Sequence, residues 1–369
     1  MKGIKLNTSE QMLLALLRSS LHEREPETNF FHNVTEEDWK QCYNLAIAQG
    51  VMALAWDGLL RLPKEYQPIR RVKLPWAMAV ERYEAKYLRY CKTVVELSAF
   101  YANHGIEMVQ LKGVGFSTLY PVPSHREGGD IDIYTYSADK SCMSDHEANQ
   151  LADKLMAEQG LKIDFHSYKH SNFNFKGVPV ENHKCFLDVK EFKEAIIADE
   201  ILVKEFKPVS VELPEGQVQI PSPTFNSFFI VFHALQHYGR GIALHHLCDW
   251  AIILKNYGWL IPEEMKSDRF LNAVKAMTHI CNEYLGTDVH VEGGKELVHE
   301  MIQEILDPTF KVEIPPMSKL NILIYKVRRL RHYIELKSHV FDISVRWRIW
   351  DSIVSHICRP NTIFERKNK

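Results

Sequence analysis

The stretch VQLKGVGFSTLYPVPSHREGGDIDIYTY, residues 109–136, decides the fold of this 369-residue chain. It begins within a short apolar run, residues 106–111, which predicts a β-strand. A glycine-containing turn follows, and GVGFSTLY predicts a short helix that starts there. The chain then returns as DIDIYTY, residues 130–136, which predicts a second strand. This order of elements indicates a fold that mixes helices with a β-sheet.

Two aspartates separated by one isoleucine stand at the start of the second predicted strand. Residues two apart on a strand share a face, so Asp130 and Asp132 project together while Ile131 points to the opposite layer. Burying ionised carboxylates without a partner is costly, so a positive charge must compensate them. Carboxylate oxygens together with substrate phosphates are ligands that Mg²⁺ prefers, and a pair of such ions assists phosphoryl displacement. The pair therefore predicts a site for magnesium, with two ions.

A third carboxylate is expected on a later strand. In VPVENHKCFL, residues 178–187, strand periodicity puts Glu181 and His183 on one face and Val180 on the other. Glu181 is therefore the predicted third metal ligand, His183 is a candidate nucleotide-binding residue, and Asp188 is the reserve choice for the third ligand.

The turn after the first predicted strand is suited to binding an anion. In LKGVG, residues 111–115, backbone N–H groups at a helix start can face a phosphate. Lys112 and Arg126 add positive charge, and Gly113 stands at the centre of the turn. Gly115 and Ser117 lie nearby and are counted among the candidate nucleotide-binding residues. Neither GxxxxGK[ST] nor GxGxxG is present in this stretch.

The sequence on either side is predominantly helical. Thr8 with Gln11 and Thr35 with Asp38 resemble helix N-caps, and a longer helix is expected after Pro75. Residues 145–159 predict a helix, and residues 168–189 predict two strands joined at Lys176 and Gly177. LPEGQVQIPSP, residues 213–223, is typical of a loop. The predicted regions are an N-terminal helical region, the mixed core and a C-terminal helical region, at residues 1–104, 105–215 and 222–369.

Composition narrows the class of partner. The chain is 46% hydrophobic and 25% charged, with a formal net charge of -2, which argues against a general nucleic-acid binder. Residues 320–369 contain 11 Lys and Arg against 4 Asp and Glu, so this basic tail is a possible docking surface for an acidic partner. The seven scattered cysteines fit reduced thiols, and a cytoplasmic location is expected. No run approaches the ~18 apolar residues that span a bilayer.

Several histidines fall in the third region. His233 and His237 are four residues apart, as metal ligands on a helix can be, but the glutamate of HExxH is missing, which favours a structural role. The sequence HHLCD, with His245, His246 and Asp249, suggests an HD-type phosphohydrolase site but lacks the further His and Asp in the required arrangement.

These motifs together resemble a known family. LKGVGFSTLY, Arg126, GDIDIY and VENH are similar to the motifs of a bacterial family of uncharacterised nucleotidyltransferases, within the superfamily of DNA polymerase β. DWKQCYNLAIAQGVMALAWDGL and FHALQHYGRGIALHHLCDW resemble the helical segments of that family, so the resemblance covers roughly residues 35–260. It implies an α+β fold, with a polymerase-β-like core in which helices accompany a mixed sheet, flanked by helical regions.

The resemblance also implies an activity: metal-dependent transfer of a nucleotidyl group from an NTP to an unidentified acceptor, which is a small molecule, a saccharide or a protein. Asp130, Asp132 and Glu181 would be the catalytic metal ligands. One departure is that Val114 follows Gly113, where the wider superfamily has Gly-Ser or Gly-Gly. A noncatalytic nucleotide-binding or scaffold protein of the same fold is therefore an alternative, and an interaction protein with a basic tail is another.

The helical segment after residue 222 is expected to cover the open face of the core. A metal site that faced bulk water would orient a triphosphate poorly. FHALQHYGRGIALHHLCDW combines apolar residues for docking with His233, His237 and Arg240, whose polar groups can reach a base, a ribose or an acceptor.

Overall fold

The computed structural model describes residues 5–190, 192–310 and 318–344 of the chain. At its centre is a six-stranded mixed sheet with the strand order β3-β4-β2-β1-β6-β5. Strand β2 runs antiparallel to β1 and parallel to β4, and β6 runs parallel to β1. The strands are β1 (Ile106–Gln110), β2 (Ile131–Ser137), β3 (His170–Phe175), β4 (Val178–His183), β5 (Pro208–Leu213) and β6 (Gly216–Pro221). The expected α+β class with a mixed sheet is confirmed.

The β3–β4 hairpin forms where the sequence predicts it. Lys176 and Gly177 connect the strands with φ angles of 51° and 80°. Positive φ at both central residues is the requirement of a type I′ turn, whose twist matches that of the paired strands. Glycine adopts this conformation at little cost, which places Gly177 at the second position.

The prediction of a loop over residues 213–223 is wrong. Residues 216–221 form β6, which pairs with β5 along its length and with β1 at Val109 and Gln219. The glycine and prolines in this stretch lie at or beyond the ends of the strand, and between them Val218 and Ile220 are buried. The sheet therefore extends beyond residue 215, while the division of the chain into separate domains stays a prediction.

The N-terminal region is helical, as expected. Thr35 and Asp38 form the predicted capping box, but the first helix is capped by Asn7 and Glu10 rather than by Thr8 and Gln11, one position away. The long helix α4 includes Pro75 near its start instead of beginning after it. The elements of this region are α1 (Thr8–His22), η1 (Thr28–Phe31), α2 (Glu36–Ala48), α3 (Met52–Arg61), η2 (Lys64–Tyr66) and α4 (Arg70–Ala102).

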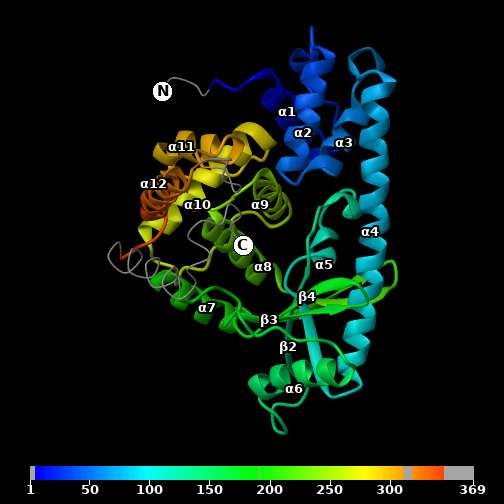
Figure 1. Ribbon diagram of the computed structural model, residues 1–369, viewed down its shortest axis with the longest axis vertical. Helices are drawn as coiled ribbons and strands as arrows, with labels where there is room; N and C mark the ends of the chain where they lie inside the picture. Colours follow the sequence, from blue (N-terminus) through cyan, green and yellow to red (C-terminus); the bar gives the residue numbers. More distant parts are fainter. Residues whose placement is uncertain (1–4, 191, 311–317, 345–369) are drawn as a thin grey trace.

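Helix α4 links the N-terminal helices to the sheet. It runs along one side of the molecule, with α1 to α3 beside one end and the sheet beside the other (Figure 1). The elements between β1 and β5 are α5 (Val114–Ser117), η3 (Pro123–His125), α6 (Asp145–Glu158) and α7 (Lys193–Glu205). The helices after the sheet are α8 (Pro223–His237), α9 (Leu244–Tyr257), α10 (Asp268–Ile280), the π-helical turn η4 (Cys281–Leu285), α11 (Lys295–Leu306) and α12 (Lys319–Ser338). The basic tail lies partly in α12 and partly outside the described residues.

Two hydrophobic clusters hold these elements together. One joins a face of the sheet to α4 and α6 and includes Ile131 and Ile133, both fully buried. The other joins the N-terminal helices to α8, α9 and α10, with Trp76 and Trp250 among its largest side chains. Because Ile131 and Ile133 enter the first cluster, strand alternation turns Asp132 to the opposite face, towards the second.

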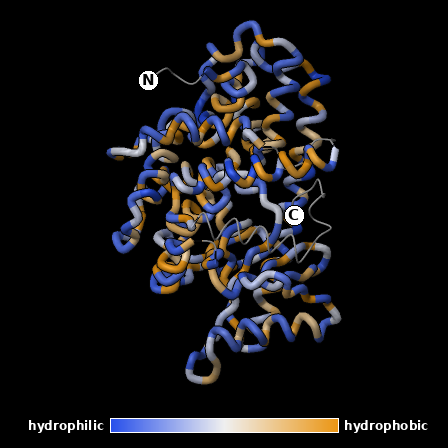
Figure 2. The backbone as a smooth tube through the Cα atoms, turned by 60° about the vertical axis from the view of Figure 1, so that its left-hand side comes forward, coloured by the Kyte–Doolittle hydropathy of each residue, from blue (hydrophilic) through white to orange (hydrophobic). Residues whose placement is uncertain are grey.

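The helices are amphipathic. Hydrophobic and hydrophilic residues alternate along most of the helical tube in Figure 2. None of the helices within the described residues is both long enough and apolar enough to traverse a lipid bilayer.

Candidate active site

The sheet register brings three predicted site residues together. Asp132 on β2 is paired with Glu181 on the parallel strand β4, and His183 lies two residues further along. His183 Nε2 is 3.0 Å from Asp132 Oδ1 and 3.7 Å from Glu181 Oε2. Asp132 and His183 are buried, whereas Glu181 is half-buried. The expected convergence of these side chains on one face of the sheet is confirmed.

Lys112 compensates the charge of Asp132. Its ammonium nitrogen is 3.2 Å from Asp132 Oδ2, and both side chains are largely buried. Burial alone would raise the pKa of Asp132, but Lys112 and His183 hold it well below its usual range. Burial likewise opposes the charge on Lys112, yet the Asp132 and Asp130 carboxylates raise the pKa of this ammonium. The predicted lysine is therefore a charge partner of the predicted carboxylate.

Asp130 stands just before β2 at the edge of the same group. Burial raises the pKa of Asp130, and the neighbouring Asp132 and Glu181 carboxylates add to this effect, against the opposing charge of Lys112. For Glu181, burial is outweighed by the nearby imidazoles of His183 and His170, so the pKa of Glu181 is lowered. The carboxylates thus differ in proton affinity, and the binding of further positive charge would favour the ionised form of Asp130.

Two further side chains of this group, those of Lys169 and His170, were missed by sequence analysis. Lys169, just before β3, lines the same cavity as Asp132 and Glu181. Burial and the nearby Lys112 lower the pKa of Lys169, although Asp132 partly offsets them. His170 Nε2 is 3.4 Å from Glu181 Oε2. The antiparallel register of β3 against β4 brings these residues close to Glu181 and His183. The spacing of residues in the sequence does not predict this proximity.

The glycine turn is built around Gln110. Gly113 has a φ of 79°, a conformation that favours glycine, and a Cβ there would lie 2.4 Å from Gln110 Nε2 and would force that side chain to shift. The Gly115 N–H donates a hydrogen bond of 2.8 Å to Gln110 Oε1. The buried Ser117 hydroxyl donates to the Val114 carbonyl at 2.6 Å. Gly113 lines the cavity, whereas the polar groups of Gly115 and Ser117 noted here are engaged inside the turn.

Arg126 is held by a carboxylate that was not predicted as its partner. Its Nε and Nη2 donate to Asp249 Oδ1 and Oδ2 at 2.7 and 2.8 Å, in a bidentate pair. Its Nη1 also lies 3.4 Å from the Gly113 carbonyl, and the Tyr120 hydroxyl donates to Asp249 at 2.6 Å. Arg126 therefore lines the cavity while joining the turn to α9. Its predicted role in phosphate binding stays a prediction.

Helices α8 and α9 form a histidine wall opposite the sheet. His233 and His237 come from α8, and His245 and His246 come from α9. Burial and the charge of Lys112 lower the pKa of His237 to about 3. Burial likewise holds the pKa values of His233 and His246 well below their usual range, so these rings are neutral near pH 7.

The histidine wall reaches the carboxylates through one lysine. His233 Nε2 is 3.4 Å from Lys112 Nζ, the same atom that contacts Asp132. The segment FHALQHYGRGIALHHLCDW was expected to cover the core, and His233 and His237 line the cavity as that expectation requires. Arg240 differs, because its guanidinium lies over the ring of Tyr333 at 4.4 Å from the centroid, and the neighbouring Gly241 lines the cavity instead.

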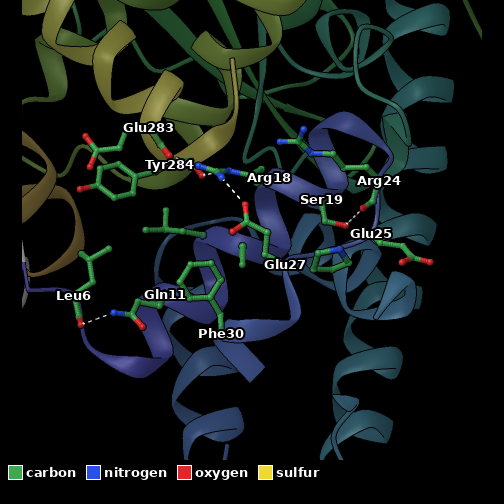
Figure 3. Close-up of a pocket in the computed structure, with 13 residues that line it drawn as sticks. Leu6, Gln11, Arg18, Ser19, Arg24, Glu25, Glu27, Phe30, Glu283 and Tyr284 are labelled. Atoms are coloured by element: carbon green, nitrogen blue, oxygen red, sulfur yellow. Dashed lines mark hydrogen bonds and ion pairs between the residues drawn. The ribbon is translucent and has the colours of Figure 1, made fainter. Parts of the chain in front are cut away.

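The carboxylates and the histidine wall enclose a polar cavity of about 470 Å³. Among the described residues its lining includes Asp130 and Glu181 but not Asp188, whose carboxylate accepts the Lys190 N–H at 3.2 Å. A second cavity, of about 320 Å³, lies beside α1. There Arg18 points to Glu27 across 2.8 Å and to the Tyr284 carbonyl across 3.3 Å (Figure 3). Because Arg18 is engaged with the protein in this second cavity, the carboxylate cavity is the better candidate.

With this geometry in view, comparison with known proteins gives a family. The sequence profile described as "Uncharacterised nucleotidyltransferase" matches residues 35–286, more than half of the chain. The chain belongs to this family. The match extends from α2 through the sheet to η4, and it contains every residue named above in the lining of the carboxylate cavity.

Other comparisons add little. A crystal structure of an antigenic nucleotidyltransferase-like protein from Paracoccidioides brasiliensis shares 13% sequence identity with this chain, covers 55% of it and 94% of its own length, and has a TM-score of 0.34. No curated protein matches the sequence significantly. The assignment to the nucleotidyltransferase family therefore rests on the profile match.

The carboxylates in this cavity are suited to a divalent metal ion. One ligand atom each from Asp132, Glu181 and His183 lies within 4.8 Å of the others. The Lys112 ammonium already stands 3.2 Å from Asp132, so this position stabilises positive charge. Carboxylate oxygens beside a polar cavity are suited to Mg²⁺, which retains waters and takes phosphate oxygens as further ligands.

Proposed function

We propose that this protein transfers a nucleotidyl group from an NTP to an acceptor hydroxyl, with magnesium held by Asp130, Asp132 and Glu181. Membership of the nucleotidyltransferase family supports nucleotidyl transfer as the class of function. The observation that carries the finer proposal is the convergence of these carboxylates, from β2, from the residue before it and from β4, on one cavity with the Gly113 turn.

In the proposed reaction, the acceptor oxygen attacks the α-phosphorus of the NTP and forms a new P–O bond. The bond between the α-phosphorus and the bridging oxygen breaks, and pyrophosphate leaves with that oxygen. When bound, magnesium would supply Lewis-acid stabilisation of charge on the phosphate oxygens. Glu181 would accept the proton of the acceptor hydroxyl, since its half-buried carboxylate lines the cavity beside Asp132.

The positive side chains of the cavity would hold the triphosphate. Lys112 and Lys169 both line the cavity. Gly113 lines it beside them, where a phosphate could approach the backbone of the turn. Lys112 would exchange part of its contact with Asp132 for a phosphate oxygen, because metal binding at Asp132 would supply positive charge in its place. His183 would orient Asp132 through the 3.0 Å contact rather than touch the nucleotide.

A noncatalytic nucleotide-binding protein is the second candidate. One observation favours it: the Gly115 N–H and the Ser117 hydroxyl are taken by Gln110 and Val114 within the turn. Arg126 is engaged by Asp249 as well. The turn thus offers fewer free donors to a triphosphate than its sequence indicates, which would weaken the hold on the leaving pyrophosphate.

The test is incubation of the protein with Mg²⁺, a cell extract and each NTP labelled at the α-phosphate. Transfer predicts that label appears on an extract component, together with release of unlabelled pyrophosphate. Magnesium-dependent NTP binding with neither product would favour the noncatalytic candidate. Salt-sensitive capture of an acidic partner that is lost on deletion of the basic tail, with no nucleotide binding, would favour the interaction protein.

A further inference from the structure

We propose that His233, His237 and His246 form a second metal site, on the histidine wall, for a transition-metal ion of the zinc class. This site is distinct from the carboxylates on the sheet and does not depend on the proposed transfer reaction. It uses three imidazoles from two helices that face the same polar cavity.

The spacing of the first two rings suits a single ion. His233 and His237 lie one turn apart on α8, and their Nε2 atoms are separated by 3.4 Å. Two nitrogens bound at ~2.0–2.1 Å to one tetrahedral ion lie ~3.3–3.4 Å apart. One ligand atom each from His233, His237 and His246 lies within 4.8 Å of the others, so a small shift of the His246 ring would complete the set.

The surroundings of the three rings differ from those of His125 and His183. His125 and His183 each face an aspartate, at 2.8 and 3.0 Å. Among the described residues, no carboxylate forms an ion pair with His233, His237 or His246. Burial keeps the rings neutral, and neutral imidazole is the form that binds metal. Imidazole nitrogens select zinc, nickel or copper over magnesium, whereas the carboxylates opposite have the reverse preference.

Two existing contacts must give way to the ion. Lys112 Nζ lies 3.4 Å from His233 Nε2, but it retains Asp132 when this contact is lost. The Ala243 N–H donates to His246 Nδ1 at 3.1 Å, which places the ring proton on Nε2. Ligation by Nε2 therefore requires the other tautomer and the loss of that hydrogen bond. The open fourth position of such a three-histidine site would face the cavity, where a water or an anionic ligand can bind.

The experiment is a titration of the chelator-treated full-length protein with Co²⁺, followed by visible absorption. The proposal predicts a saturable band of tetrahedral cobalt at one equivalent, which Zn²⁺ removes. Changing an outer-shell residue of a metal site costs 10–100-fold in affinity, so His237→Gln should weaken binding by at least about tenfold. His245→Gln is the matched control, because His245 lines the same cavity outside the triad.

A second control separates the two metal sites. Asp130→Asn combined with Asp132→Asn should retain the cobalt band, even where it abolishes magnesium-dependent NTP binding. Loss of the band in this double variant, its survival in a folded His237→Gln protein, or no band in the wild-type protein would overturn the proposal. If His237→Gln does not fold, X-ray absorption of the wild-type zinc protein replaces it. A shell of three imidazole nitrogens at ~2.0–2.1 Å is then expected, and an oxygen shell would contradict the site.

Discussion

The Arg126 guanidinium and the Asp249 carboxylate face one another through two parallel hydrogen bonds, of 2.7 and 2.8 Å, although they are 123 positions apart in the chain. This buried pair ties the loop before β2 to helix α9, and so ties the carboxylate side of the cavity to the histidine wall. Both side chains are largely buried, at 9% and 7% exposed. The shape of the candidate active site therefore depends on a contact that does not itself involve the metal ligands.

Removal of one partner of the Arg126–Asp249 pair should lower the free energy of unfolding. Asp249→Asn leaves the Arg126 charge buried without its counter-ion, and breaking a buried pair in this way costs ~3–5 kcal/mol. We expect urea denaturation to show a loss of that size in the free energy of unfolding. Tyr120→Phe removes only one hydrogen bond to Asp249 and should cost about 1 kcal/mol. Equal, small losses in the two variants would disprove the structural role of the pair.

The two lysines of the cavity should behave differently. The pKa of Lys112 is raised by Asp132 and Asp130 in spite of burial, so its charge stabilises the folded state. The pKa of Lys169 is lowered, chiefly by burial, so its charge disfavours folding. We expect Lys112→Gln to reduce the free energy of unfolding by about 2 kcal/mol or more, and Lys169→Gln to reduce it less or to increase it. Thermal melts at neutral pH compare the two, and the reverse order would contradict the charge pairing.

The His125 contacts predict a pH dependence of stability. His125 Nδ1 is 2.8 Å from Asp57 Oδ2, and its Nε2 is 3.0 Å from Glu84 Oε1. Burial opposes protonation, but Asp57 and Glu84 raise the pKa of His125 above its usual value. A raised folded-state pKa gives stability that is fully present below the unfolded value of ~6.5 and lost as the pH rises through the folded value.

Denaturation of the wild-type protein and His125→Gln at several pH values tests this. The free-energy difference between them should be about 1–3 kcal/mol at about pH 5.5 and should shrink above neutral pH. The other histidines titrate in both proteins and cancel in the difference. A difference that grows with increasing pH would mean that His125 is neutral when it contacts the two carboxylates.

Glu181 should affect transfer more than nucleotide binding. Its carboxylate is the proposed acceptor of the hydroxyl proton, so Glu181→Gln should slow transfer at least about tenfold while changing NTP affinity less. Asp188→Asn is the matched control, because Asp188 follows the same strand but lies outside the described cavity lining. Single-turnover rates and equilibrium NTP binding separate the two effects. A loss of rate at Asp188 alone would move the third carboxylate to that position.

The sequence predicts the carboxylate side of the site because strand periodicity is a local property. Asp132 and Glu181 project from neighbouring strands, and two-residue spacing alone puts Glu181 and His183 on one face. Strand β6 was missed because Gly216 and Pro221 at its ends are typical of loops, and they mask the alternation of Val218 and Ile220. The cap of α1 was misplaced by one residue, since Asn7 and Thr8 are both suitable capping residues.

The parts of the site that the sequence does not predict depend on contacts between segments far apart in the chain. Asp249 as the partner of Arg126, and Lys169 beside Asp132, follow from tertiary packing, which leaves no periodic signal. His233 and His237 were recognised as a helical pair, but His246 joins them only because α8 packs against α9. Single-sequence reasoning therefore finds pairs of residues within one element more readily than clusters between elements.

In our proposal, Asp130 and Asp132 hold magnesium for nucleotide chemistry. This proposal is tested most directly by magnesium-dependent NTP binding and pyrophosphate release, measured for the wild-type protein and for Asp130→Asn combined with Asp132→Asn. Each change keeps the side-chain volume and removes a metal-binding charge, and circular dichroism verifies that the double variant is folded. We expect both magnesium-dependent activities to be lost in the double variant. Unchanged NTP affinity and pyrophosphate release in a folded double variant would contradict it.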